Sequence, residues 1–197
     1  MDADQLVLKP LDDLFDLPAV DVAAPRAYWI GKETASSTFL LVNLSDRLWR
    51  RIELAMKEIR RDVYDMDLIN EVLGWEMMLL PGHYAAINSH WETNGLPSWF
   101  RDDDEEAVEA SAAAGNSTKE AEAKGKAVRE GELYRAYDQA SVLHFFALGK
   151  PWSYTLDQVR RNRPEAHPLF VEQFSTWRTT AKEVCPGEWN GSFIEEV

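Results

Sequence analysis

The sequence predicts an α/β protein with a mixed sheet flanked by helices, and two observations carry this prediction. Short β-prone runs alternate with amphipathic helical runs through about residue 90, which is the pattern of an α/β layer fold. With 45% hydrophobic residues in a chain of 197, there is enough apolar material for one core. We therefore expect a single domain over residues 1–197, interrupted by one insertion.

The first elements are short. Residues 5–8 are β-prone, and residues 11–18 predict a helical turn that ends at a proline. Residues 37–42 form an apolar and β-branched run without charge, as expected of a buried strand. A strand, a turn and a second strand should therefore open the chain.

Two helices should follow. Ser45 is a candidate N-cap for an amphipathic helix that extends to about Arg60. A second helix should begin near Asp65 and end at Gly74, a residue favoured in a left-handed C-terminal position. Strand candidates come next at residues 76–80 and 84–87.

The composition changes at residues 101–132, where acidic residues precede Ala, Ser, Gly, Lys and Glu. Such a segment buries little, which predicts a disordered insertion, with a transient helix in its alanine-rich part as the alternative. Residues 141–146 then predict a strand that carries His144. A C-terminal helix should bury an apolar face made of Leu169, Phe170, Phe174 and Trp177.

Charge and composition exclude several classes of function. Lys and Arg total 21 against 34 Asp and Glu, a net charge of −13, which disfavours nucleic-acid binding. The single cysteine, Cys185, allows no internal disulfide. No run approaches the roughly 20 apolar residues of a membrane span, so the sequence as given predicts a soluble chain with no membrane segment.

Asp2 and Asp4 are candidate metal ligands. In an extended backbone, carboxylates two residues apart project to one side and can hold Mn²⁺ or Mg²⁺ through oxygen atoms. However, Asp-x-Asp occurs three times in this acidic chain, at residues 2–4, 65–67 and 102–104. For any one of these pairs taken alone, a solvated surface is therefore the favoured explanation.

His144 and Lys150 strengthen the case for a site. The imidazole can complete a metal site, and the lysine six residues later supplies a positive charge for phosphate. Gly149 allows the backbone to approach a ligand, and Pro151 fixes the turn. The alternatives are a hydrogen-bonded core histidine and a surface loop with a buried Trp152.

Several motifs in order resemble glycosyltransferase family 8, the glycogenin-like retaining enzymes of GT-A fold, and in particular fungal members similar to α-N-acetylglucosaminyltransferases. The resemblance covers residues 1 to about 152 and, more weakly, Trp177 to Cys185. The matching segments are the Asp-x-Asp of residues 2–4 with the turn at 11–15, the sugar-pocket region at 25–29 and 36–45, the helix start at 64–70 and the His-to-Lys-Pro-Trp loop at 144–152.

The resemblance implies roles for individual residues. Asp2, Asp4 and His144 would ligate Mn²⁺ (or Mg²⁺), and Lys150 would neutralise the leaving nucleotide. Asp65, with Asp62 as a second candidate, would face the donor sugar as an electrostatic stabiliser or a transient nucleophile, a choice that the sequence leaves open. From the residues alone, the favoured explanation of Asp65 is an acid that complements a helix N-terminus.

The sequence departs from the family pattern at three positions. Ser36 stands where the family often has asparagine, Met66 replaces a glutamine and Ala147 replaces a glycine. Ser36 and Gly149 are nevertheless expected to contact the substrate. These departures put the identity of the sugar in doubt more than the binding of metal.

By this resemblance the chain is the C-terminal part of a GT-A enzyme, because the family places its nucleotide-binding half before the Asp-x-Asp motif. The implied partners are a UDP-sugar donor and a glycan or protein acceptor. We also expect unpaired strand edges to favour a homodimer. The family resemblance places the intact enzyme in the Golgi or, alternatively, the cytoplasm.

Two other functions remain open from the sequence. The chain could be a non-catalytic remnant or binding module of the same fold that has lost nucleotide binding. It could also be an acidic helical scaffold without a site. Binding of UDP that depends on Mn²⁺ separates the first of these from the enzyme, and a paramagnetic effect of Mn²⁺ localised at His144 separates the second.

Overall fold

The computed structural model describes residues 1–100 and 119–185, and it shows an α/β chain with two small mixed sheets. The first sheet has the order β1-β6-β5, formed by Gln5–Val7, Val142–His144 and Ala86–Ile87. β1 pairs antiparallel with β6, and β5 pairs parallel with it. The predicted class, with mixed sheets flanked by helices, is therefore confirmed.

The second sheet has the order β3-β2-β4, formed by Leu41–Val42, Val22–Pro25 and Met78–Leu80. β2 pairs antiparallel with β3 and parallel with β4. Short 3-10 helices, η1 (Asp12–Asp16) and η2 (Gly82–Ala85), precede β2 and β5. The helical turn predicted before Pro18 is thus present as η1.

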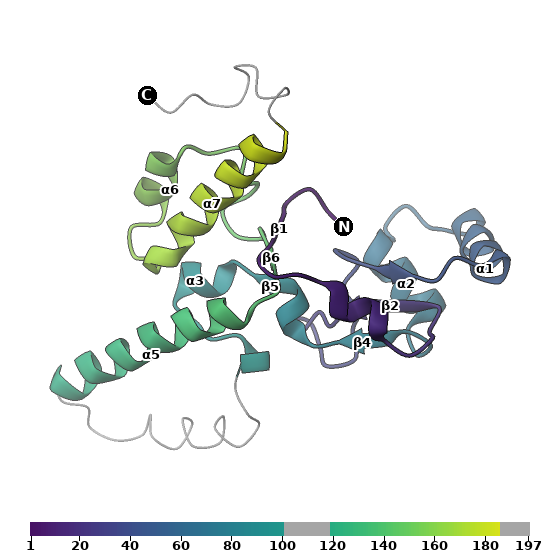
Figure 1. Cartoon of the computed structure of the whole chain (residues 1–197), viewed down its shortest axis with the longest axis horizontal. Coiled ribbons are helices and arrows are strands. Elements are labelled where there is room, and N and C mark those ends of the chain that lie inside the picture. Colours follow the sequence, from purple (N-terminus) through teal and green to yellow (C-terminus); the bar gives the residue numbers. More distant parts are fainter. Residues whose placement is uncertain (101–118, 186–197) are drawn as a thin grey trace.

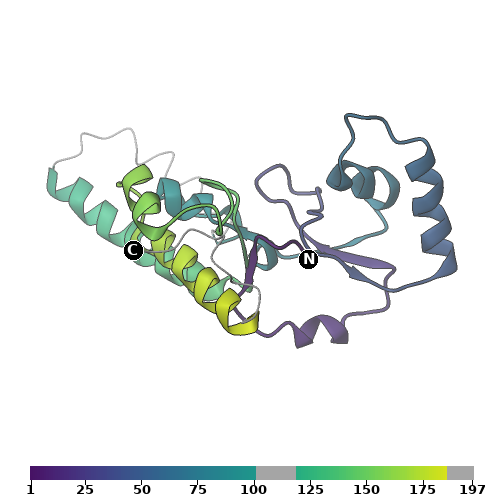
Figure 2. The same cartoon turned by 90° about the horizontal axis from the view of Figure 1, so that it is seen from above.

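Helices lie on both sides of the first sheet (Figure 1). On one side, α1 (Asp46–Lys57) and α2 (Asp65–Leu73) lie with the second sheet. On the other side lie α3 (Ser89–Thr93), α5 (Lys119–Gln139), α6 (Leu156–Asn162) and α7 (Pro168–Val184). Figure 2 shows the N-terminus between these two groups of helices. No helix in the described part of the chain is long and apolar enough to cross a membrane.

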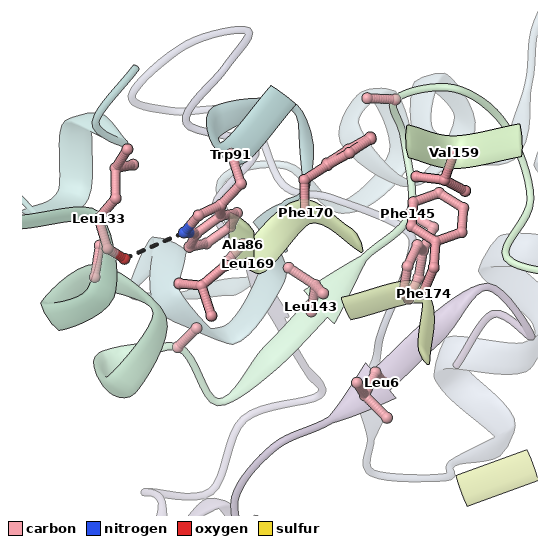
Figure 3. Close-up of a cluster of buried hydrophobic side chains, with 13 residues drawn as sticks. Leu6, Ala86, Trp91, Leu133, Leu143, Phe145, Val159, Leu169, Phe170 and Phe174 are labelled. Atoms are coloured by element: carbon pink, nitrogen blue, oxygen red, sulfur yellow. Dashed lines mark hydrogen bonds between the residues drawn. The ribbon is translucent and has the colours of Figure 1, made fainter. Parts of the chain in front are cut away.

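The larger core joins the first sheet to the helices around it. Figure 3 shows Phe145 of the chain after β6 against Phe174 of α7, with ring centroids 5.1 Å apart. Trp91 of α3 is fully buried, and its Nε1 donates to Leu133 O of α5 at 3.1 Å. The predicted C-terminal helix is α7, and its Leu169, Phe170 and Phe174 are buried as expected.

Within the predicted insertion at residues 101–132, the structure shows the helix that was the alternative to disorder. α5 begins at Lys119, so residues 119–132 are helical, while residues 101–118 lie outside the described part of the chain. The helix is anchored at its C-terminal end, where Leu133, Ala136 and Ala140 are fully buried. This tertiary anchor, which the composition of the segment does not reveal, stabilises the helix.

The predicted strand at residues 37–42 needs correction. Residues 37–42 were expected to form one buried strand, but only Leu41–Val42 pairs, at the edge of the second sheet. The central strand is β2, whose sequence Val-Ala-Ala-Pro carries little β signal. Burial, rather than propensity, therefore determines which segment becomes the central strand.

The helix ends also differ from the prediction. Ser45 caps α1 by accepting from Leu48 N, as predicted, but α1 ends at Lys57, before Arg60. Gly74 is not left-handed, since its φ is −35° and its ψ is −56°. An added Cβ there would lie 2.4 Å from Asn70 O, so this glycine serves a close backbone approach instead.

Candidate metal centre and its surroundings

The structure brings Asp2, Asp4 and His144 together in one group. One ligand atom of each residue, a carboxylate oxygen or an imidazole nitrogen, lies within 4.8 Å of the others. His144 Nε2 lies 3.3 Å from Asp4 Oδ2. Asp4 is buried, His144 is partly buried and Asp2 is exposed. The group is therefore built into the protein on one side and open to solvent on the other.

Backbone contacts from three distant segments hold this group. Asp4 O accepts a hydrogen bond from Phe145 N at 2.9 Å, next to the paired residues of β1 and β6. Asp2 N donates to Thr38 O at 3.0 Å. Residues 3 and 4 form a turn. This turn, and not the extended backbone that we expected, brings both carboxylates to His144.

The loop after His144 directs Lys150 back to the group. Leu148 and Gly149 have positive φ angles of 64° and 106°, and the latter favours glycine. Ser153 N donates to Lys150 O at 3.0 Å and closes the turn. Lys150 Nζ donates to Asp4 Oδ2. Because Lys150 contacts Asp4, its role toward a phosphate stays a prediction.

Two side chains contact the buried carboxylate of Asp4, the ammonium of Lys150 and the imidazole of His144. The Asp4 side chain is 6% exposed, while that of Lys150 is 51% exposed, so the lysine bridges from solvent to a buried acid. Burial lowers the pKa of His144 below its ordinary 6.5, although Asp4 and Asp2 act in the opposite direction. The imidazole is then neutral at pH 7, and the neutral form is the one that binds metals.

This donor set fits a hard divalent cation such as Mn²⁺ or Mg²⁺. Ligand atoms on opposite sides of one such ion lie about 4–5 Å apart, in agreement with the 4.8 Å limit of the group. His144 Nδ1 and Gln5 Oε1 are buried and bond to no described residue. Gln5 and His144 are paired across β1 and β6. Buried polar atoms without partners are uncommon in folded proteins, so their presence beside the group supports a ligand site.

A second polar network connects the group to α2. Asn70 of α2 bonds both backbone groups of Ala35, its Oδ1 accepting at 2.8 Å and its Nδ2 donating at 2.7 Å. The next residue, Ser36, is fully buried, and its Oγ lies 2.9 Å from Thr38 Oγ1. Thr38 O also accepts from Gln5 Nε2 at 2.9 Å. The predicted contact of Ser36 with a substrate stays a prediction.

The two other predicted acids do not belong to the group. Asp65 is the exposed first residue of α2, a position where a negative charge complements the positive end of a helix. The Asp62 side chain is 78% exposed and lies 3.5 Å from Arg60 Nε. Their roles toward a donor sugar therefore stay predictions, as does contact of Gly149 with a substrate.

Sequence reasoning missed Gln5 and Asn88 as parts of the site. Asn88 is fully buried after β5, and its Oδ1 accepts from Phe146 N and Ala147 N at 2.8 and 2.7 Å. Neither residue has a local signal, because both act on partners more than 30 positions away. Only the paired strands bring them to the site.

The fold and the site define an α/β chain with an Asp-Asp-His group, and sequence comparison relates this chain to fungal transferases. It is 29% identical over 204 residues, 99% of its length, to glucose N-acetyltransferase 1 of Gibberella zeae. It is 30% identical over 118 residues, 52% of its length, to glucose N-acetyltransferase 1 of Aspergillus fumigatus. The similarity to fungal members that the motifs predicted is therefore confirmed. The matches span 38% and 30% of the lengths of these relatives.

Solved structures of glycosyltransferases are also similar to this chain. The galactosyltransferase LgtC with donor and acceptor sugar analogues has a TM-score of 0.46 and 17% identity, covering 90% of this chain and 58% of LgtC. The glycosyltransferase GlyE of Streptococcus pneumoniae has a TM-score of 0.46 and 15% identity, covering 90% and 41%. No family model matches the chain.

Proposed function

We propose that this chain carries the metal and diphosphate site of a GT-A-type glycosyltransferase, which moves a hexose or N-acetylhexosamine from a UDP-sugar to an acceptor with retention. The observation that carries the proposal is the Asp2, Asp4 and His144 group with Lys150 bonded to Asp4. The two relatives are named glucose N-acetyltransferase 1, which supports a transfer that involves glucose and an N-acetyl group.

The proposed reaction breaks the bond between the anomeric carbon and the diphosphate oxygen. A bond from the acceptor hydroxyl oxygen to that carbon replaces it, and UDP and one proton are released. When bound, Mn²⁺ or Mg²⁺ supplies positive charge for the diphosphate. Lys150 adds an ammonium at the same place, where it bonds Asp4 and is half exposed to solvent. Positioned charge of this kind usually stabilises a transition state more than any other single factor.

Asp65 is our proposed carboxylate for the donor sugar. Its place at the first turn of α2 is supported by Asn70, which ties this helix to Ala35 beside Ser36. An Asp65→Asn variant should keep UDP affinity and lose transfer, because the amide has no negative charge for an oxocarbenium-like transition state. Equal transfer by this variant and by the unaltered chain would refute the role.

Calorimetry with UDP and Mn²⁺ tests the proposed site. The unaltered chain should bind UDP only when Mn²⁺ is present, and Asp4→Ala or His144→Ala should abolish that binding. Asp157→Ala is the matched control, because Asp157 is an exposed acid on α6 whose partner is Arg160. No binding by the unaltered chain at millimolar UDP would refute the proposal.

A non-catalytic binding module is the second candidate. One observation favours it: the ammonium of Lys150 already pairs with Asp4, so the charge of this buried acid is balanced without a metal. Because such a module has lost nucleotide binding, it would bind no UDP in the presence of Mn²⁺ and would release no sugar from a UDP-hexose or UDP-N-acetylhexosamine. Release of free sugar or formation of a glycoside would exclude this candidate.

A further inference from the structure

We propose that Asn88 is a positioning residue that sets the place of Lys150 relative to His144. The inference rests on the proposed function, in which Lys150 contacts a diphosphate held at the metal. Asn88 touches neither of the two side chains that would bind the ligand. It acts through the backbone of residues 146 and 147, which lie between them.

The contacts of Asn88 follow the chain from His144 onward. Asn88 N donates to His144 O at 3.0 Å. The side-chain Oδ1 then accepts from Phe146 N at 2.8 Å and from Ala147 N at 2.7 Å. Its Nδ2 donates to Ala147 O at 3.4 Å. One fully buried residue thus bonds backbone groups of His144, Phe146 and Ala147.

These bonds replace strand pairing that ends at this point. β6 pairs with β5 up to His144, opposite Ile87, and the chain then leaves the sheet. Ala147 is 7% exposed, so its N–H group is largely shielded from water. A buried backbone N–H needs a partner, and the amide oxygen of Asn88 provides one for two successive residues.

Beyond Ala147, the loop is constrained on its other side as well. Leu148 and Gly149 have positive φ, and Gly149 packs against Tyr154, where an added Cβ would lie 3.3 Å from Cε2. Ser153 N bonds Lys150 O at 3.0 Å. Asn88 therefore fixes one end of a short turn whose other end is Lys150.

The two ends of this turn should respond differently to loss of Asn88. His144 is held in β6 by pairing with Gln5 on one side and Ile87 on the other, so the metal group should persist. Lys150 depends on the turn and should lose its fixed position. Asn88→Ala should therefore retain Mn²⁺ binding, with an affinity unchanged or raised by up to about fivefold as Lys150 competes less for Asp4, and lower UDP affinity in the presence of Mn²⁺ about tenfold.

A double-mutant cycle separates positioning from a general structural role. If Asn88 acts through Lys150, then Asn88→Ala added to Lys150→Met should change UDP affinity by less than about twofold. Additive losses would overturn the proposal. Gln173→Ala, which removes another fully buried amide side chain on α7, controls for the loss of buried side-chain volume and should leave UDP affinity unchanged.

Amide hydrogen exchange on the unaltered chain tests the two hydrogen bonds that Asn88 Oδ1 accepts from Phe146 N and Ala147 N, without any ligand or variant. The N–H groups of Phe146 and Ala147 should exchange at least about a hundredfold more slowly than unstructured amides, although Phe146 as a residue is 63% exposed. Rapid exchange at both would overturn the proposal even if Asn88→Ala fails to fold. Slow exchange without any binding of UDP would refute the proposed function, and with it the role of Asn88.

Discussion

Replacing Lys150 by methionine should change metal binding and nucleotide binding in opposite directions. In the structure, the ammonium of Lys150 bonds the same Asp4 oxygen that lies 3.3 Å from His144 Nε2. A cation that binds Asp4 must compete with this ammonium. Lys150→Met removes the competitor and retains an unbranched side chain that can pack along the loop.

The magnitude follows from the exposure of the pair. Because the Lys150 side chain is 51% exposed, solvent screens the interaction, and such pairs contribute about 1 kcal/mol at most. Loss of this competition should raise Mn²⁺ affinity about fivefold. A diphosphate bound to the metal would lose a charged partner, so UDP affinity at saturating Mn²⁺ should fall about tenfold.

Calorimetric titrations of Mn²⁺ alone, and then of UDP at saturating Mn²⁺, measure both effects. Lys57→Met is the matched control, because Lys57 is 63% exposed and pairs with Glu53 on α1. This control should change neither affinity. If Lys150→Met leaves Mn²⁺ affinity unchanged or lowers it, the reasoning that the lysine competes with the metal is refuted.

Three further predictions concern stability. Burial lowers the pKa of His90 to about 4 from 6.5, so the unfolded chain binds a proton that the folded chain rejects. The free energy of unfolding should therefore fall by up to about 3 kcal/mol as the pH drops from 6.5 to 4. Urea titrations at several pH values measure this fall, which should be smaller in His90→Gln. Phe174→Ala should lower the free energy of unfolding by about 3–5 kcal/mol, because this fully buried ring packs against Phe145 and Phe170 with ring centroids 5.1 and 5.3 Å away. Urea unfolding measures this loss, and a loss below 1 kcal/mol would contradict the packing. Gly74→Ala should lower the free energy of unfolding by about 1–3 kcal/mol in the same assay, since the added Cβ would lie 2.4 Å from Asn70 O. An unchanged urea midpoint would contradict the close backbone approach.

Local patterns in the sequence predict the elements that have local causes. Ser45 is a cap because its hydroxyl bonds an amide three residues later, a relation visible in the sequence. The apolar spacing of Leu169, Phe170 and Phe174 likewise predicts the buried face of α7. Helix starts and amphipathic faces were therefore predictable.

The elements that depend on tertiary partners were not predictable. β2 is central because β3 and β4 pair with it, although its own sequence has little β propensity. α5 extends back to Lys119 because its C-terminal end is anchored in the core near Leu133. In both cases, distant contacts outweigh the local signal.

Some residues of the candidate site could likewise be predicted from the sequence, and others could not. Asp2, Asp4 and His144 were predicted because their side-chain chemistry and order match a family pattern, and the structure brings them together. Gln5 and Asn88 were missed, since their function arises from backbone groups on other strands. Side chains that bind a ligand can be inferred from chemistry, whereas side chains that hold the backbone in place require the fold.

The most direct test of the metal site is paramagnetic broadening by Mn²⁺ of the imidazole signals in the NMR spectrum. The chain has four histidines, so His83, His90 and His167 serve as internal controls within one sample. The account predicts that substoichiometric Mn²⁺ broadens His144 first, and that Asp4→Ala abolishes this selectivity. Equal broadening of all four histidines, or none at His144, would contradict a metal centre formed by Asp2, Asp4 and His144.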